Sequence, residues 1–134
     1  RSIISPTDMS RVASMINQLS SSYKSRFVVK VGEHIKMISI NSIAFFHSTG
    51  KATYIHNTSG YDYAIDQTLE QVELVVDPAG FFRVNRSCII SVEAIGDIVA
   101  YSNSRLKIVP NVKYDNEIIV SRERVQLFKK WLER

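Results

Sequence analysis

Short runs of β-branched and aromatic residues, separated by turn residues, make up most of the chain from Phe27 onward. Runs of this length and composition are typical of strands in antiparallel sheets. A chain of 134 residues can bury one compact core with an appendage, but hardly two full cores. The sequence therefore predicts one mostly β domain of antiparallel strands with a few short helices.

The turn residues divide the chain into predicted strands at 27–31, 34–40, 43–48, 52–57, 61–64, 94–101, 105–109 and 117–120. The strands at 94–101 and 105–109 are expected to form a hairpin around Ser102, Asn103 and Ser104. Asp66 is predicted to cap a short helix. Ser121 is predicted to cap a final helix, whose apolar residues we assign to the core: Val125, Leu127, Phe128, Trp131 and Leu132.

The first 25 residues have a different character. Between Thr7 and Tyr23, apolar residues recur at helical spacings, after residues that are typical of a helix start. We therefore expect residues 1–25 to form an amphipathic linker helix and residues 26–134 to form the domain. A lone helix of this length is only marginally stable in water, so it should pack on the domain or on a partner.

The charge is unevenly distributed along the chain. The net charge is +4 overall, but residues 1–30 carry +4, residues 31–80 carry −4 and residues 81–134 carry +4. Each lysine or arginine placed against a phosphate releases a condensed counterion, so this distribution suits a polyanionic partner. Charge alone is weak evidence, since many basic proteins bind no nucleic acid.

Several classes of function lack their usual signals. The chain has no apolar run of about 18 residues and no signal peptide pattern, so we expect a cytoplasmic protein without membrane contact. We find no glycine-rich phosphate loop and no nucleophile motif, and expect neither a cofactor nor catalysis. His34, His47 and His56 fall on separate strands without metal-binding spacing, so no metal site is expected. Cys88, the only cysteine, lies among apolar residues and should be a buried small hydrophobe.

The most informative segment is FFRVNRSCII, residues 81–90. Its aromatic pair and its terminal isoleucines are anchors, and Asn85, Arg86 and Ser87 form a polar tip between them. Arginine can bond bidentately to guanine, asparagine to adenine, and a serine hydroxyl to a phosphate oxygen. Taken by itself, the tip is more often structural, with Asn85 capping a turn and Arg86 in a surface ion pair.

The order of several such segments resembles that of the LytTR family. The segments are IAFFHSTGKATY at 43–54, Tyr63 with Thr68 and Leu69, FFRVNRS at 81–87, and IIVSR at 118–122. The resemblance covers residues 26–134. It implies a bacterial DNA-binding domain, usually the C-terminal output domain of a two-component response regulator, with elongated antiparallel sheets whose loops enter the major groove. The segment 1–25 would then lead from a missing receiver domain.

The resemblance also implies where the contacts lie. It assigns base contacts to Arg86, Arg122 and Thr53, although Thr53 stands where some relatives have histidine. Contacts to the DNA backbone are expected from the other polar groups near these positions: Lys51, Asn85, Ser87, Ser121 and Arg124. Paired sites in promoter DNA and a dimer on DNA are further expectations from the family. The alternative reading is a β-rich protein-interaction module whose edge strand takes up a partner peptide.

Overall fold

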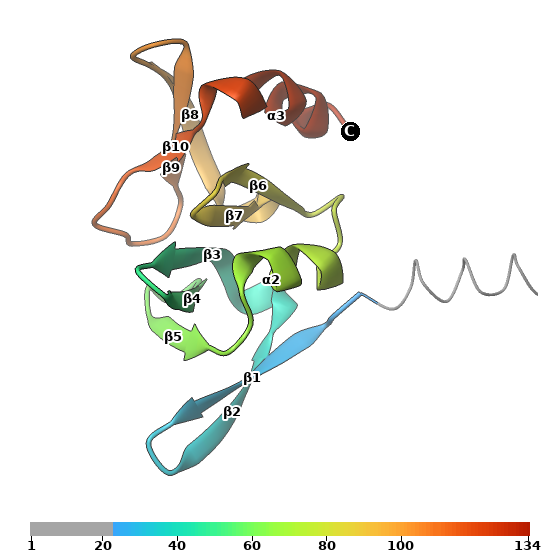
Figure 1. Ribbon diagram of the computed structural model, residues 1–134, viewed down its shortest axis with the longest axis vertical. Helices are drawn as coiled ribbons and strands as arrows, with labels where there is room; N and C mark the ends of the chain where they lie inside the picture. The colour runs from blue at the N-terminus through green and yellow to red at the C-terminus, as the bar shows by residue number, and fades with distance from the viewer. Residues whose placement is uncertain (1–22) are drawn as a thin grey trace, which may run out of the picture.

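The computed structural model describes residues 23–134, which form three antiparallel sheets. Figure 1 shows these sheets following one another along the longest axis of the molecule, with a hairpin at one end and the C-terminal helix near the other. The predicted mostly β, elongated architecture is therefore confirmed. The predicted linker helix falls almost wholly on residues 1–22, outside the described residues. Within the described part, no helix is long and apolar enough to span a membrane.

The first sheet is the hairpin of β1 (Arg26–Val31) and β2 (His34–Ser39). The central sheet has the strand order β5-β4-β3-β7-β6, with bounds Asp62–Ile65, Ala52–Asn57, Ile43–Thr49, Cys88–Ser91 and Phe81–Asn85. The third sheet has the order β10-β9-β8, with bounds Ile118–Val120, Arg105–Pro110 and Ile95–Tyr101. Two α-helices, α2 (Leu69–Val75) and α3 (Val125–Leu132), and three 3-10 turns complete the described part: η1 (Ile40–Ser42), η2 (Val92–Ala94) and η3 (Arg122–Arg124).

The central strands β3 and β7 are buried on both faces, which explains their consecutive apolar residues. Phe45 packs in one core cluster and Phe46 in another, and Ile90 and Ile89 divide in the same way. Successive side chains of a strand point to opposite faces, so a sheet covered on both sides needs apolar residues at adjacent positions. The first cluster lies toward α3 and the three-stranded sheet, and the second toward α2 and the β1–β2 hairpin.

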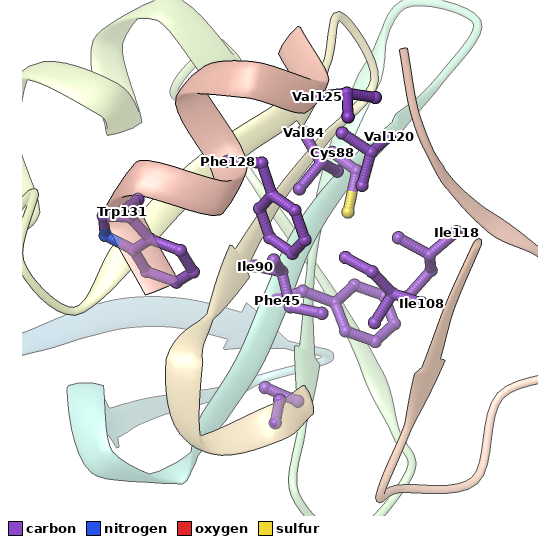
Figure 2. Packing of buried hydrophobic residues seen from close by; sticks show 12 residues of the cluster. Phe45, Val84, Cys88, Ile90, Ile108, Ile118, Val120, Val125, Phe128 and Trp131 are labelled. Carbon is purple, nitrogen blue, oxygen red and sulfur yellow. The ribbon is translucent and has the colours of Figure 1, made fainter. Parts of the chain in front are cut away.

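Helix α3 is attached through its buried aromatic residues. Phe128 is fully buried, and its ring centroid lies 5.6 Å from that of Phe82 and 5.9 Å from that of Trp131. The Trp131 indole N–H donates a hydrogen bond of 2.8 Å to the Pro78 carbonyl. Figure 2 shows Phe128 pointing from the helix toward Ile90 of the central sheet. The helix and the sheet therefore share one core.

Two predicted helix starts are wrong in detail. The residue that caps α2 is Thr68, not Asp66: its hydroxyl accepts from the Gln71 backbone N–H, while the Gln71 side chain accepts from the Thr68 N–H. Ser121 precedes η3, and α3 begins only at Val125. The Ser121 side chain makes no capping bond, because its hydroxyl faces the Val84 carbonyl at 3.4 Å.

The core assignment for the final helix holds for Val125, Phe128 and Trp131 and fails for two leucines. Leu127 is 57% exposed and Leu132 is 37% exposed. The helix has only one buried stripe, and Leu127 lies directly beside Phe128 in sequence, about 100° around the helix axis. The prediction placed too much of the helix circumference in the core.

Cys88 is buried, as the sequence predicted, with 5% of its surface exposed. Burial raises the pKa of its thiol to about 12. Because the thiolate is the reactive form, we expect a soluble disulfide reagent at pH 8 to label native Cys88 at least about tenfold more slowly than the urea-unfolded chain. The absorbance of the thiol released from the reagent measures the labelling rate. Equal rates in the two states would contradict the described burial.

Candidate nucleic-acid interface

A cleft of about 990 Å³ lies where the turn between β6 and β7, the β8–β9 hairpin and the segment from β10 into η3 meet. Its lining is rich in arginine: Arg83, Arg86, Arg105, Arg122 and Arg124. Asn85, Ser87, Asn103, Ile119, Ser121 and Glu123 complete it. Five arginines against one glutamate make this cleft a basic surface suited to a polyanion.

The polar tip predicted at residues 85–87 is the turn of a β-hairpin. Asn85 ends β6, Cys88 begins β7, and the two residues pair across the ladder, so Arg86 and Ser87 alone form the turn. The side-chain oxygen of Asn85 accepts a hydrogen bond of 2.6 Å from the Ser87 N–H. The side-chain amide N–H of Asn85 donates a hydrogen bond of 2.6 Å to the Ile119 carbonyl. Asn85 therefore holds the turn closed and ties it to β10.

Arg83 also holds this turn in place. Its side chain is 9% exposed and donates to the backbone carbonyls of Asn85 at 3.2 Å and Arg86 at 2.8 Å. It also forms ion pairs with Glu70 at 2.9 Å and Glu73 at 3.2 Å, both on α2. The hydrogen bond from this guanidinium lowers the pKa of the Glu70 carboxyl. Arg83 thus fixes the position of the turn relative to α2, and its own charge is already compensated.

Two further arginines of the cleft are held by intramolecular contacts. Arg105 donates to the Ser102 carbonyl and hydroxyl, both at 3.0 Å, and its guanidinium carbon lies 5.0 Å from the centroid of the Tyr101 ring. Arg124 donates to the Arg83 carbonyl at 3.2 Å. These contacts order the walls of the cleft.

Arg86 and Arg122 differ from the other arginines of the cleft. Both are exposed, and within residues 23–134 neither guanidinium has a hydrogen-bond or ion-pair partner. Ser87, beside Arg86, is exposed as well. Two exposed arginines in the lining of an ordered basic cleft have the donors needed for bidentate bonds to phosphates or to guanine edges.

The β3–β4 turn forms a smaller recess next to Arg86, with Lys51 and Thr53 in its lining. A hydrogen bond of 3.0 Å from the Ser48 N–H to the Ser87 carbonyl joins this end of β3 to the Arg86 turn. Lys51 is exposed, beside Gly50 at a φ of +61°, whereas Thr53 is only 7% exposed. The burial of Thr53 leaves little of its side chain for the base contact that the sequence suggested.

The structure therefore gathers the predicted residues on one side of the molecule. Six of them line the large cleft: Asn85, Arg86, Ser87, Ser121, Arg122 and Arg124. Lys51 and Thr53 lie in the adjoining recess, of which Arg86 is also part. Sequence reasoning did not select Arg83 or Arg105: within the FFRVNRS segment only the polar tip at residues 85–87 was assigned contacts, and Arg105 lies in no family segment. The two glutamates of α2, three positions apart on one helix face, are the signal that could have pointed to a buried cationic partner.

An arginine-lined cleft, with two guanidiniums that have no partner among residues 23–134 and with supporting β-hairpin turns, defines a β-rich nucleic-acid-binding module. Residues 33–133 match the family model described as the LytTr DNA-binding domain, and the chain belongs to this family. Proteins of this class bind DNA and regulate transcription, so the resemblance noted in the sequence is confirmed.

Two individual relatives agree with this assignment. An uncharacterized response regulatory protein of Vibrio cholerae serotype O1 is 23% identical over 105 residues, which cover 73% of this chain and 40% of that protein. The chain thus spans less than half the length of that relative. A solved LytTr DNA-binding domain from a Bacillus cereus response regulator shares the fold, with a TM-score of 0.72 and 20% identity, and the match covers 83% of this chain and 99% of that one.

Proposed function

We propose that this domain recognises specific sites in double-stranded DNA as the output domain of a two-component response regulator, with Arg86 and Arg122 contacting base edges in the major groove. The observation that carries the proposal is the pair of exposed guanidiniums in the lining of one ordered basic cleft, neither of which has a partner in the described part of the chain. Loops and turns enter the groove in this proposal, in contrast to helix-turn-helix proteins, which insert a helix.

The remaining predicted residues contact the DNA backbone or position the residues that contact bases in this proposal. Ser87 and Arg124 are placed to contact DNA phosphates beside Arg86 and Arg122, and Ser121 adds its hydroxyl at the same wall. Asn85 acts as a positioning residue, because both ends of its side-chain amide already bond within the protein. Thr53 forms the wall of the recess, and we do not include it among the proposed base contacts.

The partners of the domain follow from the same proposal. In the longer protein a receiver domain would precede this domain, as in response regulators generally, and its phosphorylation would control the pairing of two copies on repeated promoter sites. The protein would then work in the cytoplasm on chromosomal DNA. It would have no catalytic role, since the proposed chemistry consists only of hydrogen bonds and ion pairs to DNA.

A selection from a pool of random duplexes tests the proposal. At low salt we expect enrichment of one short motif, with an affinity that falls steeply as salt rises, because several phosphates are neutralised. If no motif is enriched, recognition of specific DNA sites is wrong. Binding of proteins or peptides with little salt dependence would instead favour the β-rich interaction module.

Lys51 should contribute to affinity without contributing to sequence choice. Lys51→Ala removes one exposed cation near the Arg86 turn and should weaken selected and unrelated duplexes alike. The slope of log K against log salt should decrease in magnitude by about one unit, as expected for one lost phosphate contact. Fluorescence anisotropy over a salt series measures this slope. Lys30→Ala, which removes the same charge from the distant β1–β2 hairpin, is the control; an effect of Lys51→Ala at one base pair only would contradict the backbone role.

A further inference from the structure

Two histidines and an aspartate meet on neighbouring strands of the central sheet, although the sequence led us to treat the histidines as scattered. His47 lies on β3, His56 on β4 and Asp62 on β5. The Asp62 Oδ1 atom is 2.9 Å from His47 Nε2 and 2.7 Å from His56 Nδ1. Spacing rules for metal ligands detect residues on one helix or one loop, whereas here the pairing of three strands brings the ligands together.

The second nitrogen of His56 settles which atoms can act as ligands. His56 Nε2 lies 2.7 Å from the backbone carbonyl of Lys113, which can only accept, so Nε2 must carry a hydrogen. The opposite nitrogen, Nδ1, then points at a carboxylate oxygen, which also can only accept. Two lone pairs cannot face each other at 2.7 Å, so a proton lies between Nδ1 and the carboxylate oxygen, and a metal ion bound by both atoms would displace this proton and move the two atoms apart.

The surroundings match those of known metal ligands. Metal-bound histidines usually donate their other ring N–H to a carbonyl or carboxylate, which orients the ring, and His56 has this contact to Lys113. His56 is 3% exposed and stacks on Phe45 with ring centroids 4.6 Å apart. The ring of Tyr114 lies 5.0 Å from that of His56 and 5.7 Å from that of His47. The imidazoles are therefore held in place before any ion arrives.

Asp62 connects this cluster with solvent. Its side chain is 44% exposed and lines a pocket of about 350 Å³ together with His56, Tyr114 and Asp115. The pocket leaves room for water at a further coordination position. Lys113 places a positive charge at the pocket, which would repel a cation, and the negative charge of Asp115 compensates for it.

We propose that His47 Nε2, His56 Nδ1 and Asp62 Oδ1 form a binding site for a divalent transition-metal ion, with Zn²⁺ as the best match. The three atoms lie within 4.8 Å of one another. Two imidazoles and one carboxylate suit Zn²⁺, which is bound at about 2.0–2.2 Å by such ligands, whereas Mg²⁺ and Ca²⁺ require oxygen ligands almost exclusively. Binding releases the proton between His56 Nδ1 and Asp62 Oδ1 to solvent, and the ring proton of His47 moves from Nε2 to Nδ1.

A loaded site would join more of the fold than the three ligands. It would tie β3, β4 and β5 together and, through the Lys113 carbonyl, the segment that precedes β10. The ion therefore should stabilise the docking of the three-stranded sheet on the central sheet. This inference does not depend on DNA binding.

Titration of the tag-free, EDTA-dialysed chain with Zn²⁺ tests the site, by calorimetry and by the melting temperature. We expect one ion per chain, a higher melting temperature, and visible absorption bands of tetrahedral coordination when Co²⁺ replaces Zn²⁺. Asp62→Asn keeps the shape of an exposed side chain and should lower the Zn²⁺ affinity at least about tenfold, as should His47→Ala. His34→Ala, on the β1–β2 hairpin, should bind as the unaltered chain does.

Three results would overturn the site. They are the absence of one-to-one binding by the unaltered chain, an unchanged affinity in folded Asp62→Asn, and an equal loss in His34→Ala. The first would leave the cluster as a hydrogen-bonded network held by protons. Because Asp62→Asn alters a partly exposed side chain and not a buried ring, its circular dichroism should match that of the unaltered chain. The test therefore remains decisive even if the His47→Ala variant does not fold.

Discussion

Replacing Arg86 by alanine should weaken binding to the selected DNA motif by about 1–3 kcal/mol, roughly 5- to 150-fold in Kd. Arg86 is exposed at the tip of the β6–β7 turn, and no partner within the described residues holds its guanidinium. The loss should be confined to the selected motif, because a base contact adds specificity whereas phosphate contacts act on every sequence. A repeated selection with the variant should show relaxed choice at one base position.

The control for this experiment is again Lys30→Ala, which removes a positive charge at the far end of the molecule. It should leave the motif unchanged and alter affinity only slightly at moderate salt, because exposed charges farther apart than about 10 Å are screened. If Arg86→Ala and the unaltered domain select the same motif with the same stringency, Arg86 does not read a base.

Phe128→Ala should have the largest effect on stability, lowering the free energy of unfolding by about 3–5 kcal/mol. The ring is fully buried between Phe82 and Trp131, and its removal leaves a cavity between α3 and the central sheet. DNA affinity should fall as well, since α3 follows directly on η3, which carries Arg122 and Arg124. Urea denaturation measures the change in free energy.

The matched control is Leu127→Ala, one residue earlier on the same helix. Its side chain is 57% exposed, so the substitution should change stability by no more than about 0.5 kcal/mol. Similar losses in the two variants would show that α3 is not attached through the face that contains Phe128.

Eight of the ten strands could be predicted from the sequence because each of these is a short apolar run that ends at a turn residue. The strands β6 and β7 were missed, because the polar residues 85–87 were interpreted as a tip between apolar anchors and not as the turn of a hairpin. The hairpin around Ser102–Ser104 is an example, since Asn103 and Ser104 adopt positive φ angles of 60° and 62° there. The helix caps were predicted less well. Asp66 and Thr68 both suit an N-cap, and only the reciprocal bonds with Gln71 distinguish them.

The candidate interface could be predicted only in part. The family segments pointed to Arg86 and Arg122, and the structure brings both to one cleft. Arg83 has the same side chain as Arg86 three positions earlier, but it lies within a strand and pairs with two glutamates of α2. Which arginine supports the site and which faces a ligand depends on such tertiary contacts. The same reason explains why the pairing of His47 with Asp62 across the sheet could not be foreseen.

The most direct test of the interface is an NMR titration of the arginine side-chain Nε–H signals with the selected duplex. The proposal predicts large shifts for Arg86 and Arg122 on formation of a one-to-one complex. It also predicts little change at Arg26 on β1, which lines neither the cleft nor the adjoining recess. If saturating DNA shifted the signals of the β1–β2 hairpin and left those of Arg86 and Arg122 unmoved, the assignment of the DNA-binding surface would be wrong.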